Sequence, residues 1–96
     1  MITSRVHSGE TPASLVFKGM YEFLVSDKKE ARLLRKLYTF VLIPCLNPDG
    51  VLCGNYRNSI AGVDLNRQWI QPEEEFHPEI FHVKNLLKRY TEVEKR

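Results

Sequence analysis

No apolar run in this sequence approaches the roughly 18 residues that a membrane-spanning helix needs. The first ten residues, MITSRVHSGE, also lack the apolar segment of a secretory signal peptide, so neither membrane insertion nor secretion is expected. Neither sign of charge dominates the sequence, because the net charge is only +2. The basic residues are dispersed or paired with acidic residues, as in KKEARLLRK. This pattern is typical of a solvated helix face and argues against a nucleic-acid partner.

Cysteine is scarce too. The chain has two, with Cys45 inside an apolar run and Cys53 in an expected loop, and it has no CxxC motif. We therefore expect free thiols in a reducing, cytoplasmic compartment, rather than a disulfide or a cysteine metal site.

The apolar residues that the sequence does contain, 43% of its 96 residues, suffice for the core of one small domain. Residues 2–7 indicate a short strand. Residues 12–26 carry apolar side chains at helical spacing, and residues 28–37 indicate a second short helix. Residues 39–46 form an apolar run that is typical of a strand buried on both faces of a parallel sheet. Strand, helix and strand predict an α/β fold with a right-handed βαβ unit.

A long polar stretch follows, from Asn47 to Glu75, and it is rich in Asn, Gly, Pro, Asp and Arg. Long loops in compact domains are usually functional or disordered. Apolar anchors within the stretch argue against disorder; they are Tyr56, Ile60, Val63, Leu65 and Trp69. Pro78 is expected to begin a final amphipathic helix.

The pattern is that of an incomplete α/β domain. Only two strands are evident, and parallel strands need neighbours in the sheet and cover on both faces. The last residues lie in a charged helix, where an α/β protein is expected to return to its sheet. We therefore expect the chain to be part of a larger domain.

The first candidate site is HSGE, residues 7–10. Residues three apart on a strand point to opposite faces, so His7 and Glu10 need a turn between them to converge, and Gly9 can supply it. Imidazole nitrogen and carboxylate oxygen are normal zinc ligands. An ordinary polar turn, with Glu10 favouring the start of the next helix, explains the same residues.

The second candidate is NPDGVLCGNYR, residues 47–57. Asn-Pro-Asp-Gly predicts a tight turn where the second strand ends. Because sites in open α/β sheets lie beyond the carboxyl ends of the strands, this turn and His7 should open onto one edge. Arg57 is either a surface arginine or an anion clamp.

The third candidate is AGVDLNRQW, residues 61–69. It places Asp64, Asn66 and Arg67 among apolar residues. A guanidinium beside an amide can hold a carboxylate by two-point contact, although a salt-bridged loop is the simpler explanation of each residue alone.

Taken together and in this order, HSGE-TPAS, NPDG…GNYR and AGVDLNRQW resemble the zinc carboxypeptidase family. More narrowly they resemble its cytosolic carboxypeptidase branch, whose members shorten glutamate chains on tubulin and related proteins. The resemblance runs from about Ile2 to about Tyr90. It implies a partial zinc-carboxypeptidase-like fold, a βαβ unit of a mixed, mostly parallel sheet flanked by helices. Residues 1–96 would form the N-terminal portion of the catalytic domain.

The resemblance also implies a zinc site. His7 and Glu10 match two ligands of Zn²⁺, and Asp64 matches the carboxylate that accepts a hydrogen bond from the ligand histidine and fixes its tautomer. The branch commonly has HPGE at the first motif, so Ser8 here replaces a proline and is expected to remove some rigidity.

The same resemblance implies a substrate site. Arg57 matches the catalytic arginine that polarises the scissile carbonyl and stabilises the oxyanion. Asn66 and Arg67 match the pair that binds the terminal carboxylate of the substrate, which an exopeptidase must recognise.

Two parts of the family pattern are missing. The third zinc ligand belongs to an HGH or HAH motif and the general base is a later glutamate, and the sequence contains neither motif. We interpret His77 as a residue at the start of the last helix, His82 as a helix residue, and Glu73–Glu75 as a solvated acidic run.

The leading hypothesis is part of a cytosolic zinc metallocarboxypeptidase, a hydrolase that removes C-terminal residues, with glutamate favoured. This chain alone would be inactive. Its partners would be protein or peptide C-termini, with glutamylated tubulin as a candidate, and the remainder of the catalytic domain. Its location would be cytoplasmic, with microtubules as a candidate site. A non-catalytic module that binds acidic C-terminal tails, and an inactive α/β fragment, are the alternatives.

Two structural predictions follow from these assignments. Residues 2–7 and 39–46 should pair in parallel with the 12–26 helix on one face. The five residues of the zinc and carboxylate sites should gather at one sheet edge, with Asp64 within hydrogen-bond reach of His7. Antiparallel pairing, or Asp64 on the far side of the sheet, would contradict the assignments.

Overall fold

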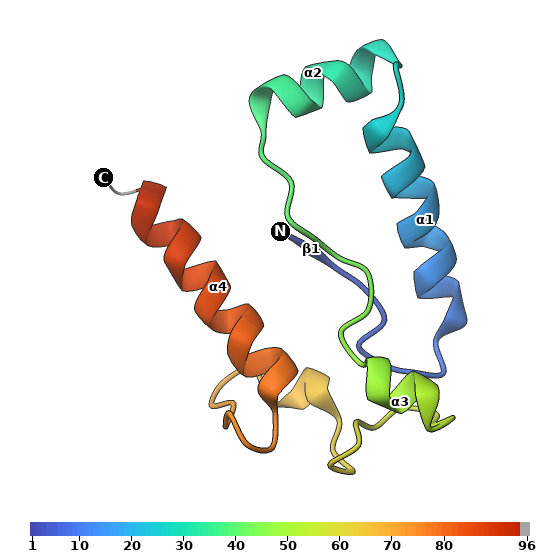
Figure 1. The fold of residues 1–96 in the computed structure, drawn as a ribbon, viewed down its shortest axis with the longest axis vertical. Helices are drawn as coiled ribbons and strands as arrows, with labels where there is room; N and C mark the ends of the chain where they lie inside the picture. The colour runs from blue at the N-terminus through green and yellow to red at the C-terminus, as the bar shows by residue number, and fades with distance from the viewer. Residues whose placement is uncertain (95–96) are drawn as a thin grey trace.

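The structure is a computed structural model that describes residues 1–94, and its centre is a pair of short parallel strands. Strand β1 (Ile2–Thr3) lies beside β2 (Leu42–Ile43), with Ile2 opposite Leu42 and Thr3 opposite Ile43 (Figure 1). The predicted parallel pairing is therefore confirmed.

The strands are shorter than the predicted ranges, 2–7 and 39–46. Backbone hydrogen bonds continue past the strands, from the Leu46 N–H to the Ser4 carbonyl (2.9 Å) and from the Asn47 N–H to the Arg5 carbonyl (3.2 Å). Regular pairing stops because the Leu46 N–H, rather than the Cys45 N–H that the register would place there, donates to Ser4, and because Arg5 adopts a left-handed backbone with φ of 54°. The two chains thus stay side by side as irregular segments up to the polar motifs.

Two helices make the crossover between the strands. They are α1 (Thr11–Val25) and α2 (Lys29–Leu37), close to the predicted bounds. The Arg35 guanidinium fixes the corner between them by donating to the carbonyls of Leu24 and Ser26. Thr11 is the first helical residue, Glu10 occupies the capping position, and no side chain caps this end.

The NPDG motif begins a helix, which corrects the expectation of a simple turn. Helix α3 (Pro48–Leu52) follows directly after Asn47, whose side-chain oxygen accepts from the Gly50 N–H at 2.9 Å. Asparagine before a proline in the first turn is a good helix start. Asn47 is fully buried, and its amide nitrogen also donates to the Asn58 carbonyl at 3.2 Å. A Cβ on Gly50 would lie 2.5 Å from this amide, so only glycine fits there.

The rest of the chain forms a single turn of 3₁₀ helix, η1 (Leu65–Arg67), and the long helix α4 (Pro78–Glu94). The core lies between the strand region, η1 and α4. Its buried members are Leu46, Leu65, Ile80 and Val83, and Val6, Ile43, Val63 and Trp69 pack against them. A single small core of this kind holds η1 in a fixed place beside the strand ends.

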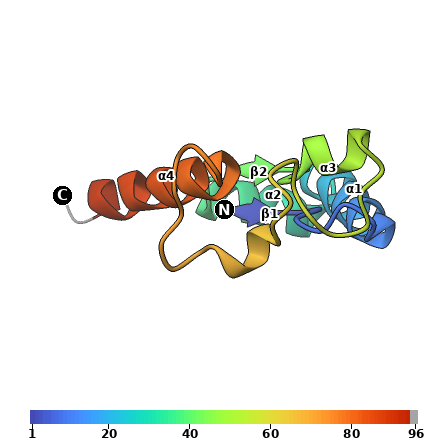
Figure 2. The same ribbon diagram turned by 90° about the horizontal axis from the view of Figure 1, so that it is seen from below.

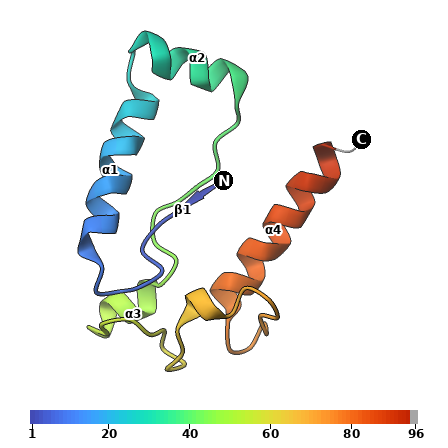
Figure 3. The same cartoon turned by 180° about the vertical axis from the view of Figure 1, so that it is seen from behind.

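The molecule is flat, with principal extents of 43 × 35 × 16 Å. The strands lie between α1 on one side and α4 on the other, and the view from below shows one thin layer (Figures 2 and 3). Of the helices in the described part of the chain, none combines the length and apolarity that crossing a membrane requires.

We predict that Leu65→Ala lowers the free energy of unfolding by about 2–5 kcal/mol, since it removes a fully buried side chain from a small core. Urea unfolding of the two proteins measures the difference. The matched control is Leu52→Ala, which truncates a leucine that is 86% exposed and should change stability little. Equal effects of the two substitutions would contradict the assigned core.

Candidate active site

The segment that follows β1 folds into a turn anchored to α1. The Arg5 side chain donates from Nε to the Ser8 carbonyl (2.9 Å) and from its terminal nitrogen to the Ser14 hydroxyl (2.7 Å). The Glu10 N–H donates to the His7 carbonyl at 3.2 Å and closes the turn. Gly9 thus lies in a tight turn between the two residues, as predicted, and brings their side chains to one side.

This turn is also bound to the loop that carries Arg57. The Ser8 hydroxyl donates to the Asn55 carbonyl at 2.6 Å, and the Gly9 N–H donates to the Tyr56 carbonyl at 2.6 Å. Ser8 is buried. Its hydroxyl therefore makes a hydrogen bond to the Asn55 loop that a proline could not make. This bond offsets the loss of rigidity predicted for a serine in place of a proline. A Cβ on Gly9 would lie only 2.5 Å from the Tyr56 oxygen, so the close approach requires glycine.

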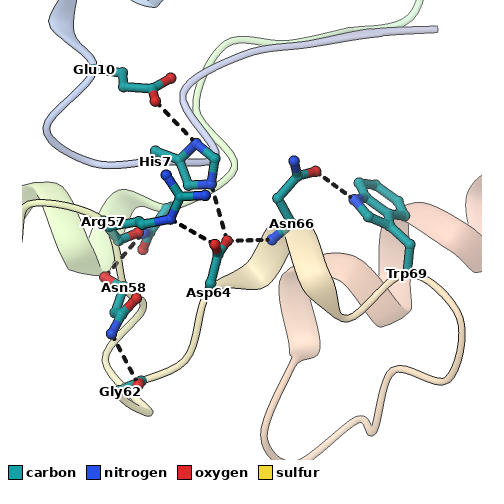
Figure 4. Close-up of polar contacts among 9 residues, drawn as sticks. His7, Glu10, Arg57, Asn58, Gly62, Asp64, Asn66 and Trp69 are labelled. Atoms are coloured by element: carbon teal, nitrogen blue, oxygen red, sulfur yellow. Dashed lines mark hydrogen bonds and ion pairs between the residues drawn. The ribbon is translucent and has the colours of Figure 1, made fainter.

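The carboxylate of Asp64 connects the three motifs. Its Oδ1 accepts from His7 Nε2 at 3.0 Å and from the Asn66 N–H at 3.0 Å, and its Oδ2 accepts from Arg57 Nε at 2.7 Å (Figure 4). The predicted contact between Asp64 and His7 is present, although 57 positions separate them in the sequence.

The environment of Asp64 keeps it ionised. Burial raises the pKa of this carboxyl, but the hydrogen bonds from Arg57, His7 and the Asn66 N–H, together with the Arg57 charge, outweigh burial and hold the pKa below its usual value. Because a carboxylate oxygen can only accept, the contact with Asp64 favours the His7 tautomer that carries its proton on Nε2.

This tautomer prepares the other ring nitrogen for a cation. His7 Nδ1 lies 3.3 Å from Glu10 Oε1, and with the proton on Nε2 both atoms are acceptors whose lone pairs face each other. A metal ion or a second proton relieves that repulsion. Two donors about 2.1 Å from a tetrahedral zinc lie about 3.4 Å apart, close to the spacing seen here. His7 and Glu10 therefore fit zinc in donor type and in separation.

A complete zinc site needs more than these two residues. Within residues 1–94, no group of three or more His, Cys, Asp or Glu side chains could hold a metal ion. His77 is buried at the start of α4, where its Nδ1 accepts from the Glu73 N–H at 3.1 Å. His82 is largely exposed and lies 3.8 Å from Glu74. Both histidines thus have the structural positions that the sequence predicted, away from His7.

Arg57 offers donors beside the candidate metal ligands. Asp64 engages its Nε, and the side chain is 40% exposed, so the terminal nitrogens remain accessible to a bound molecule. Asn47 holds the loop from behind, through the carbonyls of Arg57 (3.5 Å) and Asn58. A planar guanidinium fixed at one edge in this way presents two donors in a defined direction.

Asn66 and Arg67 are consecutive on η1, and both are exposed. The Asn66 side-chain oxygen accepts from the Trp69 indole nitrogen at 3.0 Å (Figure 4). Within residues 1–94, the Arg67 side chain makes no hydrogen bond or ion pair, while its backbone N–H donates to the Asp64 carbonyl. The pair is therefore positioned next to Asp64, with the guanidinium open to a ligand.

Two residues that support the site were not predicted from the sequence. Trp69 was predicted only as an apolar anchor, and no role was predicted for Arg5. A partly buried indole normally finds an acceptor for its N–H, and that rule could have drawn attention to Trp69. No local pattern marked Arg5, because its role depends on the fold of the following turn.

The model of the zinc carboxypeptidase family, Peptidase_M14, matches residues 1–92. The chain belongs to the zinc carboxypeptidase family. It is 56% identical over 89 residues to cytosolic carboxypeptidase 6 of Caenorhabditis elegans, covering 93% of this chain and 19% of that protein. It is also 56% identical over 87 residues to human cytosolic carboxypeptidase 4, covering 91% of this chain and 8% of that protein.

Solved structures agree with this assignment. A metallo-carboxypeptidase from Pseudomonas aeruginosa in complex with (2-guanidinoethylmercapto)succinic acid matches with a TM-score of 0.76 and 36% identity, over 88% of this chain and 23% of that one. A metallo-carboxypeptidase from Burkholderia cenocepacia matches with a TM-score of 0.74 and 36% identity, over 88% of this chain and 24% of that one. The chain therefore spans at most about a quarter of the length of these relatives.

Family membership makes zinc the cofactor and confirms the resemblance and the fold class expected from the sequence. The two donors of the HSGE turn have the chemistry and the spacing that zinc requires. The individual roles of the six site residues stay predictions.

We predict that Gly9→Ala lowers the free energy of unfolding of this zinc carboxypeptidase chain by about 1–3 kcal/mol, because the new methyl group would overlap the Tyr56 carbonyl. Urea unfolding is the measurement. Gly19→Ala is the matched control, since it meets no atom within 4 Å and should stabilise α1 by about 0.5–1 kcal/mol. A stabilising Gly9→Ala would show that the turn does not contact the Tyr56 loop.

We also predict that Asp64→Asn shifts the neutral His7 ring toward the tautomer protonated on Nδ1, since an amide no longer favours a proton on Nε2 by charge. Imidazole ¹⁵N chemical shifts report the tautomer directly. Asp27→Asn is the control, because Asp27 is an exposed aspartate between α1 and α2. An unchanged His7 spectrum in Asp64→Asn would contradict the assigned role of Asp64.

Proposed function

We propose that this chain is the N-terminal portion of the catalytic domain of a zinc carboxypeptidase that removes C-terminal residues, glutamate foremost, from acidic protein tails such as those of tubulin. The observation that carries the proposal is the Asp64 carboxylate, which is bonded at once to His7, Arg57 and the Asn66 backbone. These contacts support the proposal because they bring together the residues proposed as a metal ligand, a donor to the scissile carbonyl and part of a carboxylate-binding loop.

In this proposal His7 Nδ1 and a Glu10 carboxylate oxygen hold the zinc. When bound, zinc would activate water and act as a Lewis acid toward the scissile carbonyl. Asp64 keeps the His7 proton on Nε2, so that Nδ1 remains a ligand. The third ligand and the general base would come from the remainder of the catalytic domain.

Arg57 would stabilise charge that develops on the carbonyl oxygen. Its Nε is fixed on Asp64, so its terminal N–H groups are already oriented before a substrate arrives. Such preorganised donors stabilise a developing oxyanion without reorganisation during the reaction.

Asn66 and Arg67 would bind the free carboxylate of the substrate. A guanidinium and an amide N–H₂ side by side suit two-point recognition of a carboxylate. The Pseudomonas metallo-carboxypeptidase was solved with a succinic acid derivative, a dicarboxylic compound, and this supports carboxylate recognition in the fold. The requirement for a free chain end makes the reaction that of an exopeptidase.

The preference for glutamate, the tubulin substrate and a cytoplasmic, microtubule-associated location rest on the cytosolic carboxypeptidase branch. Support comes from relatives named cytosolic carboxypeptidases at 50–56% identity. At the first motif this chain has Ser8 where the branch commonly has a proline.

A second candidate function is a non-catalytic module that binds acidic C-terminal tails. It is favoured by the exposure of Asn66 and Arg67 side by side on η1, where a carboxylate could bind without a metal ion. Such a module would bind the same chain ends without cleaving them.

We predict that the 96-residue chain binds zinc only weakly, does not hydrolyse a poly-glutamate peptide, and binds that peptide feebly. Catalytic zinc normally has three protein ligands, and loss of the general base alone typically costs a factor of about 10² to 10⁴ in rate. Calorimetric zinc titration and a peptidase assay are the measurements. Submicromolar zinc affinity, or turnover that His7→Ala abolishes, would show that the chain supplies a third ligand and a base itself.

We further predict that Arg67→Ala weakens peptide binding by about 10- to 100-fold, as expected for loss of a charged hydrogen bond to a carboxylate. Arg32→Ala is the matched control, because Arg32 is an exposed arginine on α2, remote in sequence from η1. Equal losses in the two variants would mean that overall charge, rather than a carboxylate site on η1, attracts the peptide.

A further inference from the structure

The indole of Trp69 determines which end of the Asn66 amide faces outward. Trp69 Nε1 lies 3.0 Å from the Asn66 side-chain oxygen (Figure 4). An indole nitrogen can only donate, so the amide must turn its oxygen toward Trp69. The amide N–H₂ is then left free to donate to something else.

Trp69 is itself held firmly. Its ring packs against the core cluster beneath η1, and the Lys84 ammonium from α4 donates to the carbonyls of Trp69 (2.6 Å) and Ile70 (2.7 Å). The direction of the Asn66 amide is thus fixed through the indole by α4 and the core.

Without the indole, the Asn66 amide would have no such preference. Asn66 is exposed, and the terminal torsion of an asparagine has a broad, roughly two-fold profile. In one orientation the amide donates to a carboxylate, and in the other its oxygen faces the carboxylate and repels it. Fixing the amide beforehand removes this cost of binding.

We propose that Trp69 is a positioning residue that holds the Asn66 amide with its N–H₂ group ready to donate to the terminal carboxylate of a substrate. The inference rests on the proposed function and adds to it a residue that acts through Asn66. Its role is to select one of the two amide orientations, in concert with Lys84.

The test is a double-mutant cycle in the 96-residue chain with Trp69→Phe, Asn66→Ala and both together. Binding is measured by calorimetry for a glutamate-ended peptide as its free acid and as its C-terminal amide. Trp69→Phe keeps an aromatic ring but removes the N–H donor and part of the indole volume. We expect about a three- to tenfold loss for the free acid and none for the amide, because lost packing alone would weaken both peptides equally. In the Asn66→Ala background, Trp69→Phe should cost nothing further. An equal loss in both backgrounds would overturn the proposal, because Trp69 would then act through the fold.

A second measurement does not depend on peptide binding. Trp69 is the only tryptophan, so its indole N–H gives one resonance, which Asn66→Ala should shift upfield. An unshifted resonance would overturn the proposed positioning. If the wild-type chain binds acid and amide peptides equally, carboxylate recognition in the proposed function fails. An upfield shift would then still support the fixed amide orientation. Matching unfolding midpoints for wild type and Trp69→Phe confirm that both proteins are folded.

Discussion

The ionised carboxylate of Asp64 is the interaction on which the candidate site depends. It accepts three hydrogen bonds, from the imidazole of His7, the guanidinium of Arg57 and the backbone of Asn66. Each donor comes from a different sequence motif, so one side chain aligns all three. The same carboxylate favours the His7 tautomer that leaves Nδ1 facing Glu10, the arrangement that the proposed zinc site requires.

Asp64 can do this because the backbone around it is fixed from several directions. Leu65, the next residue, is fully buried in the core and secures η1. Buried Asn47 holds the preceding loop, and the hydrogen bonds from Ser8 and Gly9 to that loop hold the HSGE turn against it. The polar site thus obtains its rigidity from hydrogen bonds that side chains and backbone groups make to loop carbonyls, and a small apolar core packs beneath it.

Sequence patterns predicted the elements of regular structure well and their ends less well. The parallel strands, the two crossover helices and the helix from Pro78 all occur close to the predicted positions. The NPDG motif was assigned to a turn but begins α3, because asparagine followed by proline suits both structures locally. The buried Asn47 side chain stabilises the helix. Its oxygen accepts from the Gly50 N–H within the motif, and its amide nitrogen donates to the Asn58 carbonyl beyond the motif.

The sequence by itself determined the chemistry of the donors, their order along the chain and the family resemblance, because residue types and spacing are local properties. It also determined the parallel pairing, through an apolar second strand and a helical crossover. Only the tertiary structure decided that Asp64 meets His7 across 57 positions, that Ser8 tethers the turn, and that Trp69 orients Asn66. These contacts join segments that are far apart in the sequence. Whether such segments meet depends on packing and loop closure, which cannot be predicted from the residue pattern of any one segment.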